Sequence, residues 1–344
     1  MNTKIFFIFL SLLLLVSCSS EDHFLICKIS EYDCDYQHNI PGIITVTKGS
    51  SRKHYALTEN GMKKIEINDG EPVAYNPQTG TAVVKEVTDS SIDLFPVNTV
   101  NGKVLSSEIV LKPERTEKNG KPFFAFPTLL SGCVQNDGTI VLLVKYENLL
   151  IVKNSASPYS EEDAENIDFL YVYEKGDVKK LKKYMFPQNE ISENETASGD
   201  FLEEPEQIQC ADKNIYLFSE KIYAHEEAFY HSSKPVHLLR KINLEPQKEE
   251  KNITPLALIA YDDIHLSRYF EKENSLYTVT RSSENEADRL HILRMNNGYE
   301  LPEEPVEKGE GEFLFSETPD GKPLVFFVKN RKNAEEEQRL EPVF

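Results

Sequence analysis

The sequence predicts an all-β protein, and two observations lead to that prediction. Short runs rich in Val, Ile, Leu, Tyr and Phe recur along the chain, and residues that favour turns separate them. Helical periodicity of apolar residues, by contrast, is nearly absent. The runs come in adjacent pairs, which is the arrangement of antiparallel hairpins. Strands are therefore expected to form nearly all of the regular structure.

Three strand pairs are predicted in the first half of the chain, each with polar or turn-forming residues at its join. The sequence Asn136-Asp137-Gly138 precedes the third pair and predicts a tight turn, because glycine accepts a positive φ. The pairs are 43–48 with 53–58, 81–87 with 91–97, and 140–146 with 149–153, joined at Gly49-Ser50, Asp89-Ser90 and Glu147-Asn148.

Further pairs are predicted in the second half. The last pair is joined by residues 319–323, where proline presets φ and Gly321 accepts a positive φ, so this join is expected to be a turn. Asn297-Gly298 is another predicted turn. The pairs are 167–174 with 178–184 across Lys175-Gly176, 214–220 with 236–244, 275–281 with 289–295, and 312–316 with 324–329.

The later pairs share a format: an aromatic-rich strand, a polar join, then an apolar strand. Residues 215–218 (IYLF), 276–279 (LYTV) and 313–315 (FLF) are the first strands of three such pairs. The pairs recur at roughly forty to seventy residues, which fits the blades of a β-propeller. In this format the chain resembles bacterial β-propeller proteins over most of its length, although it has no tryptophan and no WD dipeptide.

The resemblance implies a β-propeller of six or seven blades, and residues 24–29 are expected to close the ring by pairing with the last blade. The alternative is two β-sandwich domains that meet near residues 155–165. Segments 155–166 and 189–207 are acidic and the tail 330–341 is charged, and all three are poor in apolar residues. They are predicted to be exposed, because they bury too little surface to offset the cost of ordering.

The first residues predict export. Residues 5–16 are apolar apart from Ser11, and a helix of that length spans roughly 18 Å, well short of the ~30 Å hydrocarbon core of a bilayer. With Lys4 before it, this is the pattern of a signal peptide, predicted to occupy residues 1–17. The following residues, Leu15-Val16-Ser17-Cys18, resemble the lipobox of bacterial lipoproteins.

That resemblance implies cleavage after Ser17 and lipidation of Cys18, so that the protein is held on a membrane by its lipid. Residues 18–23 would form the lipidated tether and 24–344 the propeller-like domain. Ser19-Ser20-Glu21-Asp22 resembles acidic signals that send some lipoproteins to the cell surface. The predicted location is the cell envelope, at the outer membrane and exposed on the surface.

The charge of the protein argues against one class of partner. The formal net charge of −19 argues against nucleic acid, since an acidic protein repels phosphate backbones.

With Cys18 lipidated, the other cysteines are candidates for disulfides, which persist outside the cytoplasm. Three pairings are possible, and buried free thiols are the alternative. These cysteines are Cys27, Cys34, Cys133 and Cys210.

The sequence identifies no catalytic residue, cofactor or metal site: the motifs GxSxG, HExxH, GxGxxG and the P-loop are missing. A polar cluster is interpreted as loop residues rather than metal ligands. It comprises His225, Glu226, Glu227, Tyr230, His231 and His237.

The leading hypothesis is a non-catalytic binding protein for a protein, peptide or glycan ligand. The alternatives are a cell-envelope hydrolase or lyase with a site in the central channel, and a structural subunit of an outer-membrane assembly.

Overall fold

The fold was analysed in a computed structural model of the full chain. The described residues are 24–28, 30–67, 70–88, 90–118, 121–151, 159–160, 166–185, 201–223, 236–242, 253–259, 264–281, 287–295, 305–333 and 335–344. Predictions for the signal peptide 1–17, for Cys18 and the tether 18–23, and for the turn Asn297-Gly298 lie outside these residues.

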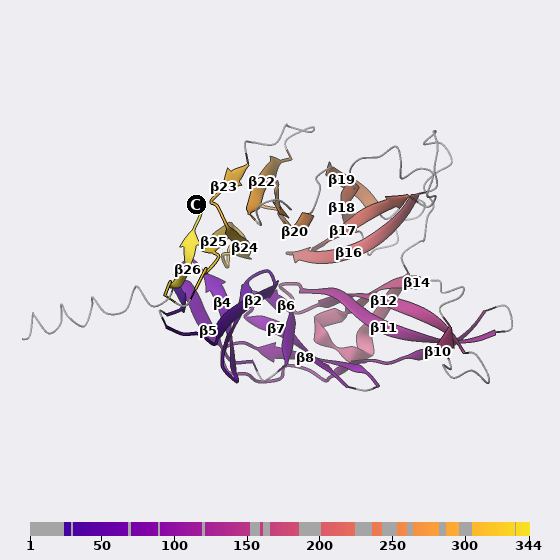
Figure 1. Ribbon diagram of the computed structural model, residues 1–344. Coiled ribbons are helices and arrows are strands. Elements are labelled where there is room, and N and C mark those ends of the chain that lie inside the picture. The colour runs from indigo at the N-terminus through magenta and orange to yellow at the C-terminus, as the bar shows by residue number, and fades with distance from the viewer. Residues whose placement is uncertain are drawn as a thin grey trace, which may run out of the picture.

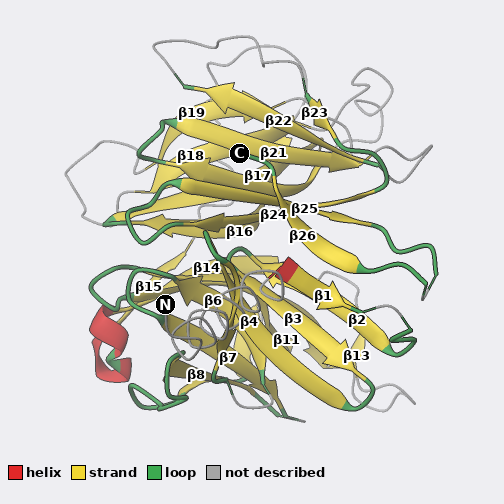
Figure 2. Cartoon of the chain, turned by 90° about the vertical axis from the view of Figure 1, so that its left-hand side faces the viewer, coloured by secondary structure: helices red, strands yellow, loops and turns green. Residues whose placement is uncertain are grey.

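The protein is a β-propeller, as the sequence predicted, and of the six or seven blades expected it has six, all antiparallel sheets (Figures 1 and 2). Blades 1, 2, 4 and 5 each consist of consecutive strands. Blade 1 contains β2 (Cys34–Ile40), β3 (Ile43–Lys48), β4 (Ser51–Thr58) and β5 (Gly61–Ile65). Blade 2 contains β6 (Glu71–Asn76), β7 (Thr81–Val87), β8 (Ile92–Asn98) and β9 (Ile109–Leu111). Blade 4 contains β16 (Phe201–Ala211), β17 (Asn214–Tyr223), β18 (Val236–Ile242) and β19 (Ile253–Ile259). Blade 5 contains β20 (Ile264–Phe270), β21 (Ser275–Arg281), β22 (Asp288–Arg294) and β23 (Val306–Glu307).

Blades 3 and 6 depart from this plan. Blade 3 is enlarged by a hairpin strand and a short extra strand, whereas blade 6 takes its outermost strand from the start of the chain. Blade 3 contains β10 (Glu114–Lys118), β11 (Lys121–Val134), β12 (Ile140–Ile151), β13 (Tyr159–Ser160), β14 (Asn166–Tyr173) and β15 (Leu181–Met185). Blade 6 contains β24 (Gly311–Glu317), β25 (Pro323–Lys329), β26 (Gln338–Pro342) and β1 (Leu25–Cys27).

Apolar packing between neighbouring blades forms the core. Six clusters of buried residues are present, and each joins one blade to the next, including blade 6 to blade 1. Between blades 5 and 6, for example, Phe270 meets Tyr277 edge to face with ring centroids 4.9 Å apart, and Phe313 and Phe327 pack beside them. Middle strands are apolar on both faces because each face is covered by a neighbouring blade. Their sequences are therefore nearly continuous apolar runs.

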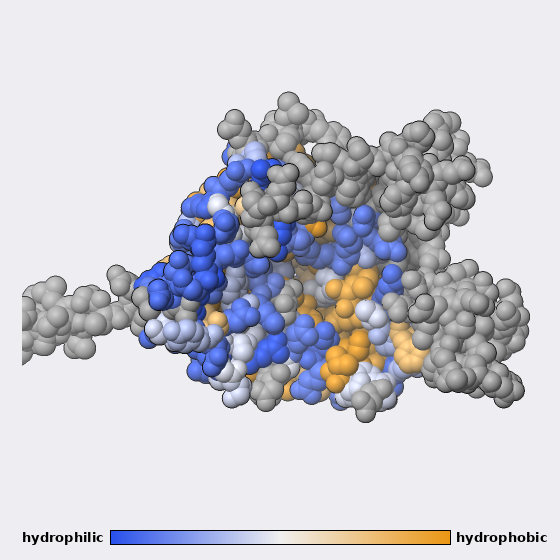
Figure 3. Space-filling model, in the orientation of Figure 1, coloured by the Kyte–Doolittle hydropathy of each residue, from blue (hydrophilic) through white to orange (hydrophobic). Residues whose placement is uncertain are grey.

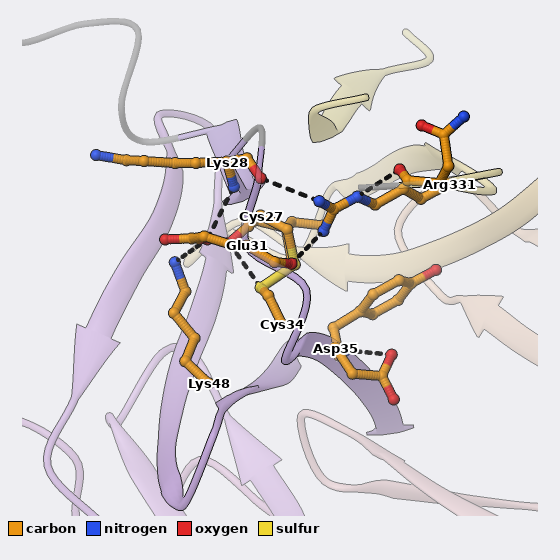
Figure 4. Close-up of a disulfide and its surroundings, with 10 residues drawn as sticks. Cys27, Lys28, Glu31, Cys34, Asp35, Lys48 and Arg331 are labelled. Atoms are coloured by element: carbon orange, nitrogen blue, oxygen red, sulfur yellow. Dashed lines mark hydrogen bonds and ion pairs between the residues drawn. A yellow bond between two sulfur atoms is a disulfide. The ribbon is translucent and has the colours of Figure 1, made fainter. Parts of the chain in front are cut away.

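The ring is closed where the sequence placed the closure. Strand β1 pairs with β26, with Leu25 opposite Arg339, so the expectation that residues 24–29 pair with the last blade is confirmed for Leu25–Cys27. Figure 4 shows a disulfide from Cys27 to Cys34 that ties this strand to blade 1. Arg331 adds bonds to the intervening turn: Nη1 donates to the carbonyl of Glu31 (2.9 Å) and Nη2 to that of Lys28 (3.2 Å).

Several local predictions were wrong. The polar pair Glu147-Asn148 is no turn, because β12 runs through it while pairing with β11 from residue 140 to residue 150. The predicted strand 178–184 begins as a 3-10 turn (Val178–Lys180), and the strand itself starts at Leu181. Part of the segment 189–207 belongs to strand β16, and the charged tail contributes β26, in which Leu340 is buried. Pairing along the backbone ordered these segments despite their polar side chains.

Candidate functional site: the central cavity

A cavity of about 340 Å³ lies where the inner strands of the six blades converge. We call it the central cavity. Its volume falls in the range of roughly 300–1,000 Å³ that is typical of small-ligand sites. Each blade contributes to its wall, through residues that include His38 and Ile40 of β2, Tyr75 of β6, Leu129–Val134 of β11, Glu206–Cys210 of β16, Leu266 and Arg268 of β20, and Glu317 of β24.

Polar bonds link the inner strands of neighbouring blades and make this wall continuous. Gln209 is the fullest example: its side-chain oxygen accepts from Tyr269 N (3.0 Å), and its side-chain nitrogen donates to the carbonyl of the same residue. Gln209 therefore replaces strand pairing between blades 4 and 5. The other links are Asn76 Nδ2 to Val134 O (2.9 Å), Ile208 N to Ser131 Oγ (3.2 Å), Arg268 to Glu317 (3.1 Å) and Gly42 N to Phe315 O (2.8 Å).

A second disulfide lies in this wall. Cys133 of β11 and Cys210 of β16 are bonded, both are buried, and both line the cavity. The sequence left three disulfide schemes open for the four cysteines. The structure contains the scheme with bonds Cys27–Cys34 and Cys133–Cys210. The first bond closes the ring and the second joins blades 3 and 4, so the two have different structural roles.

Most charged side chains around the cavity are paired with a neighbour of opposite charge. Glu71 lies 3.0 Å from Lys85, and Arg268 lies 3.1 Å from Glu317. Two histidines also face carboxylates: His237 Nδ1 is 3.5 Å from Glu206, and His265 Nε2 is 3.3 Å from Asp288. His237 comes from the predicted histidine cluster, whose other members lie outside the described residues.

His38 and Arg268 each have a buried nitrogen that meets no hydrogen-bond partner among the described residues. These atoms are His38 Nε2 and Arg268 Nε, while Nη2 of Arg268 donates to Glu317. The pKa of His38 is lowered to about 4, chiefly because burial disfavours the charged imidazolium, while a backbone hydrogen bond to Phe315 opposes this and the charge of Arg268 reinforces it. The imidazole of His38 is therefore neutral at pH 7.

Tyr75 supplies an aromatic ring to the wall, and a glycine lets the ring approach. Gly42 has φ +85°, and a Cβ atom there would lie 2.9 Å from Cδ1 of Tyr75, closer than real Cβ contacts come. Burial raises the pKa of Tyr75 to about 12, so its phenol stays neutral. Gly42 thus meets both a backbone and a packing requirement at the edge of the site.

Sequence reasoning did not find the residues of this cavity other than its two cysteines. His38, Gln209, Arg268 and Glu317 are spread over nearly the whole chain, and no local motif relates them. The available signal was the cysteine pair, since a bond between Cys133 and Cys210 would have placed two distant strands side by side. Which further residues meet there depends on the closed ring.

Exposed apolar side chains lie away from the cavity lining. Figure 3 shows hydrophobic surface at the lower right of the described part, where Figure 1 places β8, β11 and β12. Among described residues, the large exposed apolar side chains of blades 2 and 3 are Val87, Val100, Val104, Leu105, Val110 and Leu181, and none of these lines the cavity.

Within the described part of the chain, no helix is long and apolar enough to span a bilayer. No three His, Cys, Asp or Glu side chains within those residues are grouped so as to hold a metal ion.

Comparison with known proteins yields structural likeness alone. No family model matches the chain, and no curated protein matches its sequence. Among solved structures, a subtype N11 neuraminidase-like protein of A/flat-faced bat/Peru/033/2010 (H18N11) is 10% identical, with a TM-score of 0.38, over 92% of this chain and 94% of that one. Extracellular domains 1-2 of Drosophila semaphorin 1b are 8% identical, with a TM-score of 0.36, over 93% and 87%.

Proposed function

We propose that the protein is a lipid-anchored, non-catalytic binding protein of the cell envelope, which receives part of a protein, peptide or glycan ligand in its central cavity. The observation that carries the proposal is a recess lined by residues from all six blades. The links between inner strands make the recess preformed, and a preformed site lowers the ordering cost of binding.

The ion pairs of the charged side chains around the cavity favour a binding function over a catalytic one. A general acid or base must exchange a proton with substrate at hydrogen-bond distance. Glu71 and Glu317 are instead ion-paired with Lys85 and Arg268, and the second pair links blades 5 and 6. Such pairs hold the wall in position, which suits a binding surface better than a hydrolase or lyase site.

The anchoring half of the proposal rests on the lipobox-like sequence that ends at Cys18. Residues 18–24 span roughly 20 Å at most when extended, and Phe24 lies directly before strand β1 of blade 6. Lipid on Cys18 would therefore keep blade 6 close to the membrane surface. The acidic residues that follow Cys18 favour the outer face of the outer membrane.

Replacing the lipidated residue tests the anchor. We expect Cys18→Ala to move the protein from the membrane fraction to the soluble fraction, because the acyl chains on Cys18 are its predicted attachment to the membrane. The measurement is fractionation followed by mass spectrometry of the amino-terminal peptide, with Ser20→Ala as the matched control that stays membrane-bound. Retention in salt-washed membranes of Cys18→Ala protein from which residues 1–17 have been removed would contradict lipid anchoring through Cys18.

The binding half is tested by thermal shift of the full-length protein against panels of peptides and glycans. A ligand of the folded protein at 100 times its Kd stabilises it by about 2.7 kcal/mol, which raises the melting temperature measurably. Mass spectrometry of each stabilising compound then separates the two functions. An intact compound supports binding, whereas a cleaved one shows that the hydrolase or lyase alternative is correct.

A further inference from the structure

The loop between Cys27 and Cys34 carries an inference that rests on the lipid anchor of the proposed function. We call its described residues, 28 and 30–33, the closure loop. Tyr32 of this loop is 81% exposed, more than any other large apolar or aromatic side chain among the described residues. The loop follows β1, the strand nearest to the predicted anchor, so its surroundings on that side include the membrane.

The closure loop is fixed to the propeller by several bonds. A disulfide joins its two ends, whose Cα atoms are 5.8 Å apart (Figure 4). Arg331 donates to two carbonyls of the loop, at 2.9 and 3.2 Å, and Lys48 Nζ lies 2.8 Å from the carboxylate of Glu31. A loop held in this way presents Tyr32 in one place, so little further ordering is needed when the ring makes a contact.

The length of the chain places the closure loop within reach of the predicted anchor. Strand β1 and the residue before it span roughly 10 Å from Phe24 to Cys27. The loop returns on itself, so it extends at most about 12 Å beyond Cys27. The tether of residues 18–24 spans roughly 20 Å at most. Because these lengths are comparable, acyl chains on Cys18 can lie in the bilayer while Tyr32 lies at its surface.

The chemistry of the closure loop suits the headgroup layer of a membrane. A tyrosine ring has an apolar body and a polar hydroxyl, and such rings are enriched at membrane–water interfaces. Lys28 and Lys48 are matched by Glu31 and Asp33, so attraction to the interface does not depend on anionic lipid. A protein partner is the less favourable occupant, because it would have to enter a space of roughly 20 Å or less between blade 6 and the bilayer.

We propose that the closure loop rests on the headgroup layer of the membrane that holds the lipid anchor, with the ring of Tyr32 among the headgroups. A lipid anchor on a tether limits the distance of the protein from the bilayer but not its orientation. The second contact fixes the orientation, with blade 6 at the membrane. Blade 3 lies opposite blade 6 in the ring of six, and Figure 1 places β26 and the hairpin of β11 and β12 on opposite sides. Blade 3 is therefore farthest from the bilayer.

Single tryptophans test the contact, because the chain contains none of its own. Full-length lipidated Tyr32→Trp and Leu181→Trp proteins are bound to phosphatidylcholine vesicles, with and without a nitroxide on the lipid headgroup. Leu181 is the matched control, since it is 42% exposed and lies in blade 3. We expect the nitroxide to lower the tryptophan emission of Tyr32→Trp by about half or more, because the ring lies among the headgroups, and to leave that of Leu181→Trp unchanged.

Flotation of the same vesicles separates this proposal from the anchor on which it rests. If both proteins float with the vesicles but Tyr32→Trp is not quenched, or is quenched no more than Leu181→Trp, the anchor stands and the membrane contact is wrong. The exposed ring of Tyr32 would then be open to a protein partner. If neither protein floats, the anchor is wrong and the membrane contact is overturned with it.

Discussion

Replacing Cys133 and Cys210 together by alanine is expected to lower the free energy of unfolding by about 4.5 kcal/mol under oxidising conditions. The bond links positions 77 residues apart, so it removes much of the conformational entropy that the unfolded chain would otherwise have. It also joins the inner strands of blades 3 and 4 at the cavity wall, where the two Cα atoms are 5.5 Å apart.

The matched control is the other disulfide. Cys27 and Cys34 are only seven residues apart, so their double alanine variant is expected to lose about 2.5 kcal/mol. Denaturant unfolding without reductant measures both values, and a thiol count by mass spectrometry confirms which bonds are present. If the two variants lose the same stability, the length of the closed loop does not set how much each disulfide stabilises the protein.

Asp288→Ala is expected to destabilise the protein by about 1–3 kcal/mol, the cost of leaving buried hydrogen-bond donors without their acceptor. Asp288 is fully buried, at 0% exposure. Its carboxylate accepts from Arg281 Nε (3.0 Å) and from Phe313 N (3.3 Å), and His265 lies 3.3 Å away. Removal of the carboxylate leaves the backbone N–H of Phe313, in blade 6, without this acceptor.

Two variants separate the buried charge from surface electrostatics. Asp288→Asn keeps one acceptor oxygen but loses the charge, so we expect an intermediate loss of stability. Glu307→Ala removes an exposed partner of Arg289 in the same sheet (2.8 Å) and is expected to cost less than about 1 kcal/mol. Denaturant titration at pH 7 compares the three. Equal losses for Asp288→Ala and Glu307→Ala would show that burial does not set the value of the interaction.

The strands that sequence reasoning found are mainly the ones that neighbouring blades cover on both faces. Strands β7, β17, β21 and β25 were all predicted, and each carries a run of consecutive buried residues. The inner strands β2, β6 and β16 were missed. Their sequences contain Asp, Gln, Glu or Pro, because one end of each lies at a polar cavity and their cohesion comes from backbone pairing and from links such as Gln209 to Tyr269.

The sequence by itself determined that this is an all-β chain of paired strands, that its first strand returns to close the last blade, and that its leader predicts a lipid anchor at Cys18. Local composition records such properties, since burial between blades demands continuous apolar runs and hairpins demand turn residues. Only the tertiary structure decided that the blades number six and that His38, Arg268 and Gln209 meet around one cavity. The position of a side chain in the ring depends on how many blades close it, and no local stretch of sequence records that number.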